Sequence, residues 1–464
     1  MRTSTKMKCR LLCAAILLFA SPFARAATRH YYIAAEDVIW DYAPNNRNLI
    51  DAAPLPSPWN AKTRWPKTRF IEYTDATFST RKPQPAWLGI LGPIIRAEVG
   101  DEIIVDFFNR GHMPHSIHPH GLRYDKENEG ASYLPQSVGA RVTAGAHFTY
   151  HWFADAGSGP GPGQLSSVVW WYHGHTDEPR ETNAGLEGPI IITAKGKANP
   201  DGTPKGVDQE FVASFVIYDE LAAQPAGLFY SINGFIFGNL PGLIAKQGEK
   251  VRWYVLSLGN ETGLHSPHWH GKTLDDGTHH LDVVELLPGT AKAVDMLADN
   301  PGVWLLHCHV SDHMEAGMMA TFTIYKPQMR SCPVKLSSGN FWSSPDKFTV
   351  TVQNSSGKPI RKVSLTSEYF LGPQDLRRPF MDATWESSQP LPPGREQALE
   401  NKANALGANK QIQGWALFPS LIAYEDGTTW KPEQPGECFQ VFWRDPGHPE
   451  LPILPPLQVD TAAD

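Results

Sequence analysis

Residues 305–325 read LLHCHVSDHMEAGMMATFTIY, and this stretch decides how the chain folds and where its chemistry lies. Its last six residues alternate apolar and polar side chains, which predicts a β-strand. Alternate residues of a strand face the same side, so His307 and His309 should share one face while Cys308 points to the other. Two imidazoles, one thiolate and one thioether are the ligand set of a blue-copper electron-transfer site. The four candidate ligands are His265, Cys308, His313 and Met318.

Eight histidines of the chain occur as four His-x-His pairs, and each pair should aim two imidazoles at one locus. The pairs are His118/His120, His173/His175, His268/His270 and His307/His309. Neutral imidazole binds copper, zinc, iron and nickel well. Because eight nitrogens exceed the needs of one ion, the set predicts a metal cluster. The thiolate of Cys308 would then be joined by one peptide segment to imidazoles of that cluster.

The histidine motifs occur twice in the chain, which indicates duplication of one β-sandwich. HSIHPHG at 115–121 matches HSPHWHG at 265–271, and WYHGH at 171–175 matches LLHCH at 305–309. Gly174 stands where the second copy has Cys308, so the first copy has lost the thiolate. His115 is therefore expected to be a structural residue or to support a metal ligand from outside the ligand set.

Composition predicts an all-β protein of packed sandwiches. The chain has 40 prolines and 39 glycines, and short β-type runs alternate with turn residues while helix-period segments are few. A polar, Gly- and Pro-rich linker is expected at 195–207 and a second boundary at 326–346. These divide the mature chain into units at 27–197, 208–327 and 347–445, followed by a proline-rich extended tail at 446–464. The third unit should be a small β-sandwich without a cluster of metal ligands.

The first 26 residues have the pattern of a signal peptide. A basic start precedes a ten-residue apolar run at 11–20, and Ala24-Arg25-Ala26 provides a cleavage site. We therefore expect a periplasmic or secreted protein with no membrane span. Cleavage would remove five basic residues and change the formal net charge from −7 to −12. That balance disfavours nucleic acid as a partner, although a negative charge often serves only solubility.

Cysteine usage leaves one open question. Cys9 and Cys13 would leave with the signal peptide, so three cysteines remain in the mature chain. Cys332 and Cys438 lie in the same C-terminal region and could form a disulfide in an oxidising compartment. Spacing alone does not establish the geometry that such a bond needs.

Residues 29–327 resemble the multicopper oxidases, especially their ceruloplasmin-like branch. The resemblance is carried by HYYIAAEDVIWDY, YTDATFSTRKPQPAWLGILGPIIRAEVGD, HPHGLRYDKENEG, YHGHTDEPRETNAGLEGPI, INGFIFGN, HSPHWHG and HCHVSDHMEAGM. It does not extend over 330–464. It implies two cupredoxin-like Greek-key β-sandwich domains. The small C-terminal sandwich would come after them in the chain.

The resemblance also implies four coppers in each subunit and a role for each ligand. A type 1 copper would be held by His265, Cys308, His313 and Met318, and a type 2 copper by His118 and His268. The two type 3 coppers would be held by His120, His173 and His309, and by His175, His270 and His307. Dioxygen would be reduced to water at the last three coppers, with electrons from a small reductant.

The resemblance further suggests a homotrimer, as in two-domain laccases, with each cluster shared between unit one of one subunit and unit two of the next. Glu129, and after it Asp125, match the acidic residue that supplies protons in the family. Asp312 matches a carboxylate of the ceruloplasmin iron site, but Pro225 and Tyr230 replace the Glu and His of that site. Phenols and aromatic amines are therefore favoured over metal ions as reductants. Copper nitrite reductase and non-catalytic copper sequestration remain alternative functions.

Overall fold

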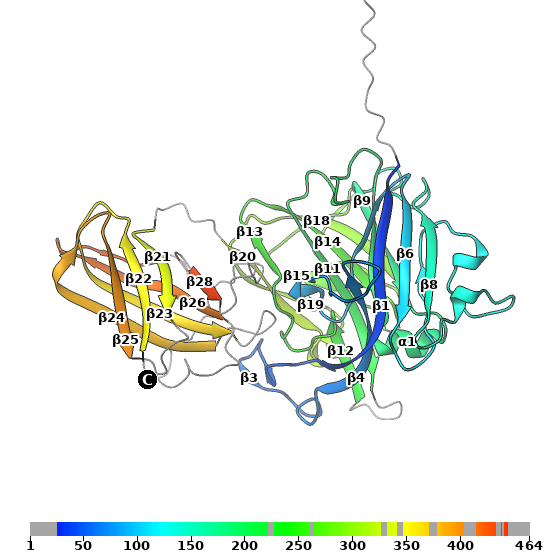
Figure 1. The fold of residues 1–464 in the computed structure, drawn as a ribbon, viewed down its shortest axis with the longest axis horizontal. Coiled ribbons are helices and arrows are strands. Elements are labelled where there is room, and N and C mark those ends of the chain that lie inside the picture. The colour runs from blue at the N-terminus through cyan, green and yellow to red at the C-terminus, as the bar shows by residue number, and fades with distance from the viewer. Residues whose placement is uncertain are drawn as a thin grey trace, which may run out of the picture.

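The computed structural model describes residues 26–220, 227–259, 263–325, 332–340, 347–370, 378–402, 414–432, 438 and 440–443. The expected signal peptide, apart from its last residue, and the expected tail lie outside these residues. β-Strands are the main secondary structure of the described chain, arranged as sandwiches that follow one another along the chain (Figure 1). In the described part, the few helices are all too short to cross a bilayer. The predicted all-β fold of cupredoxin-like sandwiches is confirmed.

The first sandwich consists of two four-stranded sheets. One has the order β4 (Arg64–Tyr73), β1 (Thr28–Asp41), β6 (Glu102–Asn109) and β8 (His147–Phe153). The other has the order β5 (Ile95–Glu98), β10 (Glu187–Thr193), β9 (Ser167–His173) and β7 (His118–Pro119). Strand β6 alternates strictly, so Ile103, Val105 and Phe107 enter the core while the residues between them face outward.

The second sandwich repeats this plan. Its larger sheet has the order β12 (Leu228–Ile232), β11 (Gln209–Asp219), β14 (Lys250–Ser257), β18 (Thr290–Leu297), β16 (Leu274–Asp275) and β17 (His280–Leu281). Its smaller sheet has the order β13 (Ile244–Lys246), β20 (Met319–Tyr325), β19 (Gly302–Cys308) and β15 (Pro267–Trp269). In both sandwiches the strand that ends in the second His-x-His motif pairs with the strand of the first motif.

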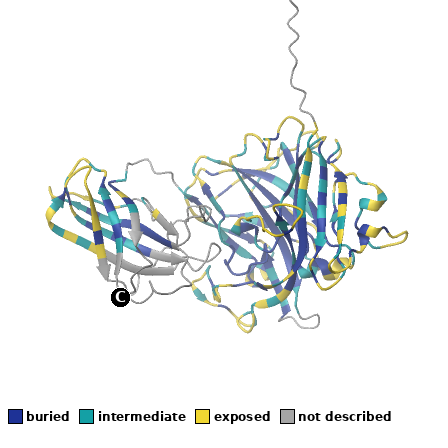
Figure 2. Ribbon diagram, viewed as in Figure 1, coloured by how far each residue is buried: buried dark blue, intermediate teal, exposed yellow. Residues whose placement is uncertain are grey.

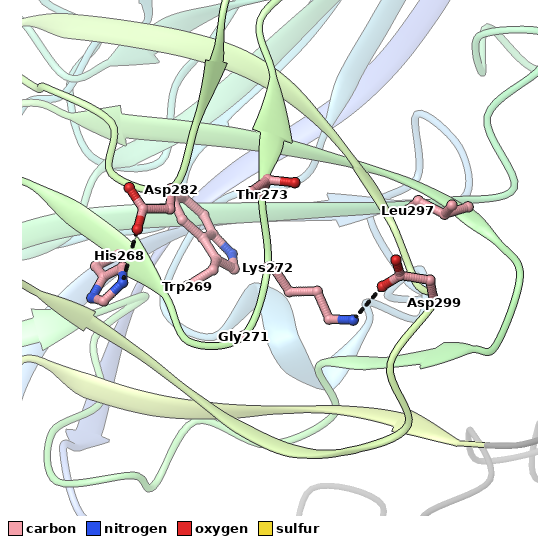
Figure 3. A pocket seen from close by; sticks show the side chains of 8 residues that line it. All are labelled: His268, Trp269, Gly271, Lys272, Thr273, Asp282, Leu297 and Asp299. Carbon is pink, nitrogen blue, oxygen red and sulfur yellow. Dashed lines mark hydrogen bonds and ion pairs between the residues drawn. The ribbon is translucent and has the colours of Figure 1, made fainter.

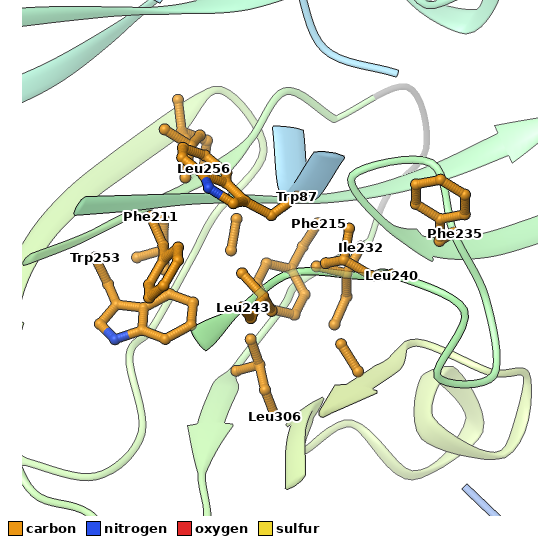
Figure 4. Packing of buried hydrophobic residues seen from close by; sticks show 14 of the residues in the cluster. Trp87, Phe211, Phe215, Ile232, Phe235, Leu240, Leu243, Trp253, Leu256 and Leu306 are labelled. Carbon is orange, nitrogen blue, oxygen red and sulfur yellow. The ribbon is translucent and has the colours of Figure 1, made fainter. Parts of the chain in front are cut away.

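One large hydrophobic core fills the second sandwich and extends to the first. Trp253 packs against Phe211 with ring centroids 4.8 Å apart, and Leu306 lies in the same cluster (Figure 4). Trp87 and Trp171, from the first part of the chain, belong to this cluster too. Burial is accordingly continuous across the two sandwiches (Figure 2). The two sandwiches therefore share part of one hydrophobic core.

The C-terminal sandwich is built from antiparallel strands alone. One sheet has the order β21 (Val334–Asn340), β22 (Lys347–Asn354) and β25 (Glu396–Lys402). The other has the order β24 (Arg378–Leu391), β23 (Ile360–Phe370), β26 (Gly414–Tyr424) and β27 (Thr429–Trp430), and β28 (Gln440–Trp443) pairs with β26. Cys332 and Cys438 form a disulfide, which links the start of this unit to its last strand. Among the described residues, no group of metal-ligating side chains occurs in this sandwich.

Short elements fill the connections. They are the hairpin β2 (Arg47–Asn48) and β3 (Ala53–Pro54), the 3₁₀ turns η1 (Ala86–Leu88), η2 (Lys126–Asn128) and η3 (Val138–Ala140), and the helices α1 (Glu178–Ala184) and α2 (Ser311–Glu315). Helices α1 and α2 follow β9 and β19, directly after the second histidine pair of each sandwich. The segment expected to be a linker, 195–207, is tied to the first sandwich, because Glu98 accepts hydrogen bonds from the backbone of Gly196 and Ala198.

Candidate metal centres

The four histidines of the first sandwich converge on one locus at the ends of β7 and β9. His120 Nε2 lies 3.0 Å from His173 Nε2, and the ring of His118 lies 5.0 Å from that of His175. His118 and His173 lie at the ends of strands, and His120 and His175 follow within two residues of those strands, where alternate side chains share a face. His118, His120 and His173 are close enough to bind a single ion.

The second sandwich holds an equivalent group. His270 Nε2 lies 3.1 Å from His307 Nε2, and the ring of His268 lies 5.3 Å from that of His309. We name the two groups the first quartet (His118, His120, His173 and His175) and the second quartet (His268, His270, His307 and His309). Their matching distances are what duplication of one sandwich should produce.

Backbone carbonyl groups fix the orientation of several of these rings. The Nδ1 atoms of His173 and His307 each hydrogen-bond to the carbonyl of the following residue, at 2.9 and 2.8 Å. The Nδ1 atom of His118 donates to the carbonyl oxygen of Glu129 at 2.6 Å. A ring that donates through Nδ1 presents an unprotonated Nε2, which is the form that binds a metal ion.

Burial keeps the candidate ligands uncharged. Burial, together with the smaller effect of neighbouring imidazoles, lowers the pKa of His118 to about 4 and that of His173 to about 3. Burial also lowers the pKa of His265 to about 3. Imidazole must be neutral to bind a metal ion, so these sites are ready to bind one at neutral pH.

Cys308 lies on the opposite face of β19 from its two neighbours in sequence. Its Sγ atom is 3.8 Å from His265 Nδ1 and 3.6 Å from His313 Nδ1, and all three residues are buried. The backbone N–H of Ser266 points at the sulfur from 3.4 Å. Burial raises the pKa of the Cys308 thiol, and a coordinating ion would remove its proton outright. The fourth candidate, Met318, is fully buried, and its carbonyl accepts a hydrogen bond from the Cys308 backbone.

The two quartets do not meet within one chain. All eight histidines are described, and no ring contact or hydrogen bond joins a member of one quartet to a member of the other. Each quartet therefore presents half of the imidazoles that the predicted cluster requires. A cavity of about 390 Å³ opens beside the second quartet, lined by His268, Lys272 and Asp282, among others (Figure 3).

The three predicted acidic residues differ in their surroundings. The Glu129 side chain binds Lys126 and accepts a hydrogen bond from Tyr133 at 2.9 Å. Burial would raise the pKa of Glu129, but these two partners outweigh it and lower the pKa. Asp125 is exposed and accepts a hydrogen bond from Asn128 at 2.6 Å. Asp312 is exposed in α2, next to His313.

Two carboxylates that the sequence did not single out lie closer to the imidazoles. Glu178 Oε2 is 3.3 Å from His175 Nε2, and its other oxygen is 3.9 Å from His173 Nε2. Asp282 Oδ2 is 3.6 Å from His268 Nε2 (Figure 3). In the sequence, Glu178 could have been found from its position three residues after His175, on the helix that follows the motif.

Comparison with known proteins identifies the family. Two family models, both described as multicopper oxidase, match residues 71–197 and 218–328. Rat (Rattus norvegicus) ceruloplasmin is 35% identical over 69% of this chain and 33% of its own length. The human (Homo sapiens) protein Ferroxidase HEPHL1 is 33% identical over 90% of this chain and 43% of its own length.

The chain thus spans less than half the length of these relatives. A solved structure described as "Crystal structure of multicopper oxidase" aligns with a TM-score of 0.47 and 22% identity over 64% of this chain and 89% of that chain. The two matched regions contain both quartets and the site around Cys308. This chain belongs to the multicopper oxidase family.

Proposed function

We propose that this protein is a copper-dependent oxidase that takes electrons from a small reductant and reduces dioxygen to water. A single observation carries the proposal: Cys308 shares a buried site with His265 and His313, while its neighbours in sequence, His307 and His309, belong to a quartet on the opposite face. One strand thus links a soft thiolate site to an imidazole cluster. Nitrite reduction at one type 2 copper does not call for four His-x-His pairs, and copper sequestration does not call for a thiolate site linked to a cluster.

The donor sets fit copper. A thiol with two imidazoles, and a buried methionine nearby in sequence, suits a type 1 copper, and the imidazole quartets suit type 2 and type 3 coppers. We propose four coppers per chain with the ligands given above for each. When bound, the coppers supply reversible one-electron chemistry and the site where dioxygen is reduced.

The residues of this chain prepare that chemistry in three ways. Burial keeps the imidazoles neutral, and carbonyl groups orient them so that Nε2 faces the site. The N–H of Ser266 points at the sulfur of Cys308 and stabilises negative charge on it. The backbone from Cys308 to His307 and His309 gives a short covalent path for electrons between the two sites.

We propose that the protein works as a cyclic homotrimer. Each chain presents two separate half-sets of four imidazoles, so a complete cluster needs the first quartet of one subunit and the second quartet of its neighbour. Two cupredoxin-like units per chain make a closed six-unit ring when three chains associate head to tail. The cavity beside His268 supports this arrangement, because it leaves the second quartet accessible to a neighbouring subunit.

Oxygen reduction consumes one proton for each electron, and carboxylates near the quartets are the groups to supply them. We retain Glu129 and Asp125 as candidates, and we add Glu178, which faces two imidazoles of the first quartet. Glu178 is favoured over Glu129 because its carboxylate faces two imidazoles, whereas the Glu129 carboxylate is paired with Lys126 and Tyr133.

The reductant is proposed to be a phenol or an aromatic amine. Tyr230 packs against His313 with ring centroids 5.1 Å apart, so an aromatic side chain lines the thiolate site. Asp312 lies next to His313 and is exposed, which suits contact with a cationic or hydrogen-bonding substrate. The match to relatives described as ferroxidases keeps ferrous ions as the competing substrate.

We further propose that the first two units are bounded at 27–197 and 208–327, and that the mature protein is periplasmic or secreted. The third unit, expected at 347–445, begins earlier, because β21 pairs with β22 in its first sheet. The pairing of Cys332 with Cys438 supports an oxidising compartment, where disulfides persist.

Copper analysis combined with oxygen uptake tests the proposed function. Purified protein should hold four coppers per chain, show the blue absorption of a copper–thiolate bond, and consume oxygen with phenols. One or two coppers with turnover of nitrite would instead support a nitrite reductase. Tight copper binding without turnover of any phenol, aromatic amine, ferrous or cuprous ion would refute an oxidase. Sedimentation should give the mass of three chains.

A further inference from the structure

The first sandwich contains a buried imidazole–carboxylate pair at the place where the second sandwich has its thiolate site. His115 Nδ1 lies 2.6 Å from Glu181 Oε1, and the two side chains are only 5% and 4% exposed. His115 pairs with Val142 in an isolated bridge, as His265 pairs with Leu286. The two histidines therefore hold equivalent positions.

The surrounding backbone repeats as well. The N–H of Gly174 donates to the carbonyl of Leu186 at 2.9 Å, and the N–H of Cys308 donates to the carbonyl of Met318 at 3.1 Å. Glu181 lies four residues before Gly185, just as His313 lies four residues before Gly317, and both are on the helix that follows the His-x-His motif. Glu181 thus takes the place of His313.

Gly174 makes room for this carboxylate. A Cβ atom on Gly174 would lie 2.8 Å from Glu181 Cβ and 3.0 Å from Glu181 Oε2. The Glu181 side chain therefore fills the space that the sulfur of Cys308 occupies in the second sandwich. The first sandwich therefore has a glutamate side chain in the place where the second sandwich has its cysteine side chain.

The carboxylate also binds the backbone that follows the second histidine pair. Glu181 Oε2 accepts hydrogen bonds from the N–H groups of Thr176 and Asp177, at 2.5 and 3.1 Å. His175 donates its own N–H to the Ser116 hydroxyl, next to His115, at 3.1 Å. One carboxylate thereby joins three segments: the loop of His115, the end of β9 and helix α1.

The remaining nitrogen of His115 is closed off. Its Nε2 atom is buried with no partner among the described residues, and a Cβ atom on Gly111 would lie 2.8 Å from it. A neutral imidazole that donates from Nδ1 carries no hydrogen on Nε2, so in that form no donor is left unpaired there. The pair is thus a buried structural contact, and the free nitrogen of His115 is not exposed to solvent.

We propose that the His115–Glu181 pair is a positioning clamp that replaces a metal centre, and that it fixes the strand end carrying His173 and His175. In the second sandwich a bound ion would tie together the segments of His265, Cys308 and His313. In the first, the hydrogen bonds of Glu181 tie the equivalent segments. The inference rests on the proposed function only in taking copper as the ion that the first quartet binds.

The clamp is tested on metal-free and copper-loaded protein with three variants. Glu181→Ala removes all the hydrogen bonds of the carboxylate, while His115→Ala removes only the one to the imidazole. Glu181→Gln keeps an oxygen that can accept from Thr176 and Asp177, so it should rescue much of the loss. Arg180→Ala is the matched control: its side chain is 73% exposed on the same helix, and it pairs with the Asp177 carboxylate, which takes no part in the hydrogen bonds of Glu181.

The first readout does not depend on copper. In the metal-free full-length chain, amide hydrogen exchange at residues 174–177 should rise about tenfold or more in Glu181→Ala, and less in His115→Ala. Exchange at 308–311 should stay as in the wild type. If the Glu181→Ala variant does not fold, the same comparison is made with His115→Ala and Glu181→Gln. Unchanged exchange at 174–177 in the variants would overturn the clamp.

The second readout is copper reconstitution. Removing a group that orients metal ligands typically lowers metal affinity about 10- to 100-fold. Glu181→Ala should show that loss for copper at the histidine cluster, while the blue absorption of the Cys308 site persists as an internal reference. Equal cluster affinity in Glu181→Ala, Arg180→Ala and the wild type would overturn the positioning role. If the wild type loads no cluster copper although exchange responds to Glu181→Ala, the proposed function fails, and the pair is a structural contact without a positioning role.

Discussion

Replacement of Glu187 by glutamine should stabilise this protein at high pH and leave it nearly unchanged at low pH. Glu187 is completely buried in β10, where the Tyr218 hydroxyl donates a hydrogen bond to one carboxylate oxygen. The other oxygen has no partner among the described residues. Burial raises the pKa of Glu187 to about 7, although the hydrogen bond from Tyr218 and the charge of Lys67 both lower it.

The direction of this pH effect on stability follows from the number of protons that the folded and unfolded states bind. In the unfolded chain the pKa of a glutamate is about 4.5, so between pH 4.5 and 7 the folded state holds a proton that the unfolded state has lost. The free energy of unfolding therefore falls as pH rises through this window. A shift of about 2.5 units at about 1.4 kcal/mol per unit makes the loss about 3 kcal/mol above pH 7. Glutamine has the same shape and cannot ionise, so the variant escapes this loss.

The assay is urea unfolding of the metal-free wild type and Glu187→Gln at pH 4.5 and pH 8. Buried histidines such as His118 and His173 act in the opposite direction, because their lowered pKa destabilises the folded state in acid. Only the difference in the free energy of unfolding between the variant and the wild type reports the contribution of Glu187 alone. That difference should grow by about 3 kcal/mol between the two pH values, whereas the exposed control Glu425→Gln should show no such growth. A difference that is constant with pH would mean that Lys67 keeps Glu187 ionised throughout, and would refute the reasoning.

Three further outcomes are expected. Cys308→Ser should abolish the blue absorption and remove one copper per chain, while the histidine-bound copper remains. The reason is that a serine hydroxyl does not replace a thiolate as a soft ligand. Absorption spectroscopy and metal analysis check this. Trp253→Ala should lower the free energy of unfolding by about 3–5 kcal/mol, and Trp253→Phe by less, because the buried indole N–H has no partner among the described residues; urea titration checks both. Cys332→Ser should destabilise the C-terminal sandwich by up to about 4–5 kcal/mol, because it opens a loop whose ends are 106 residues apart; calorimetry checks this.

The sequence was sufficient to predict the side chains that meet within one strand. The period of two along a strand puts His307 and His309 on one face and Cys308 on the other, and the structure has this arrangement. The repeated motif likewise predicted the duplication of one sandwich, and the structure shows two sandwiches in which the strands of the two motifs pair in the same way. Both predictions depend only on local geometry.

Contacts that depend on the helix after each motif could not be predicted in this way. Glu178 and Glu181 reach the imidazoles because α1 folds back on the end of β9, and no strand periodicity encodes that return. Asp282 reaches His268 from a loop, through an isolated bridge between His268 and Val283. For Glu129 the position after the first motif was informative, yet it is the backbone carbonyl that contacts His118. Which atom of a residue meets a ligand is decided by tertiary packing.

The asymmetry between the two sandwiches gives the proposed assembly a functional consequence. Cys308 is covalently continuous with His307 and His309, so the path from the thiolate site to the second quartet lies within one chain. The first quartet has no such connection, since Gly174 provides no sulfur and Glu181 fills the space. A dissociated chain would therefore keep a site that accepts an electron but would lack a complete cluster to pass it on. Reduction of the blue centre should then be independent of protein concentration, whereas oxygen uptake should fall once dilution separates the subunits.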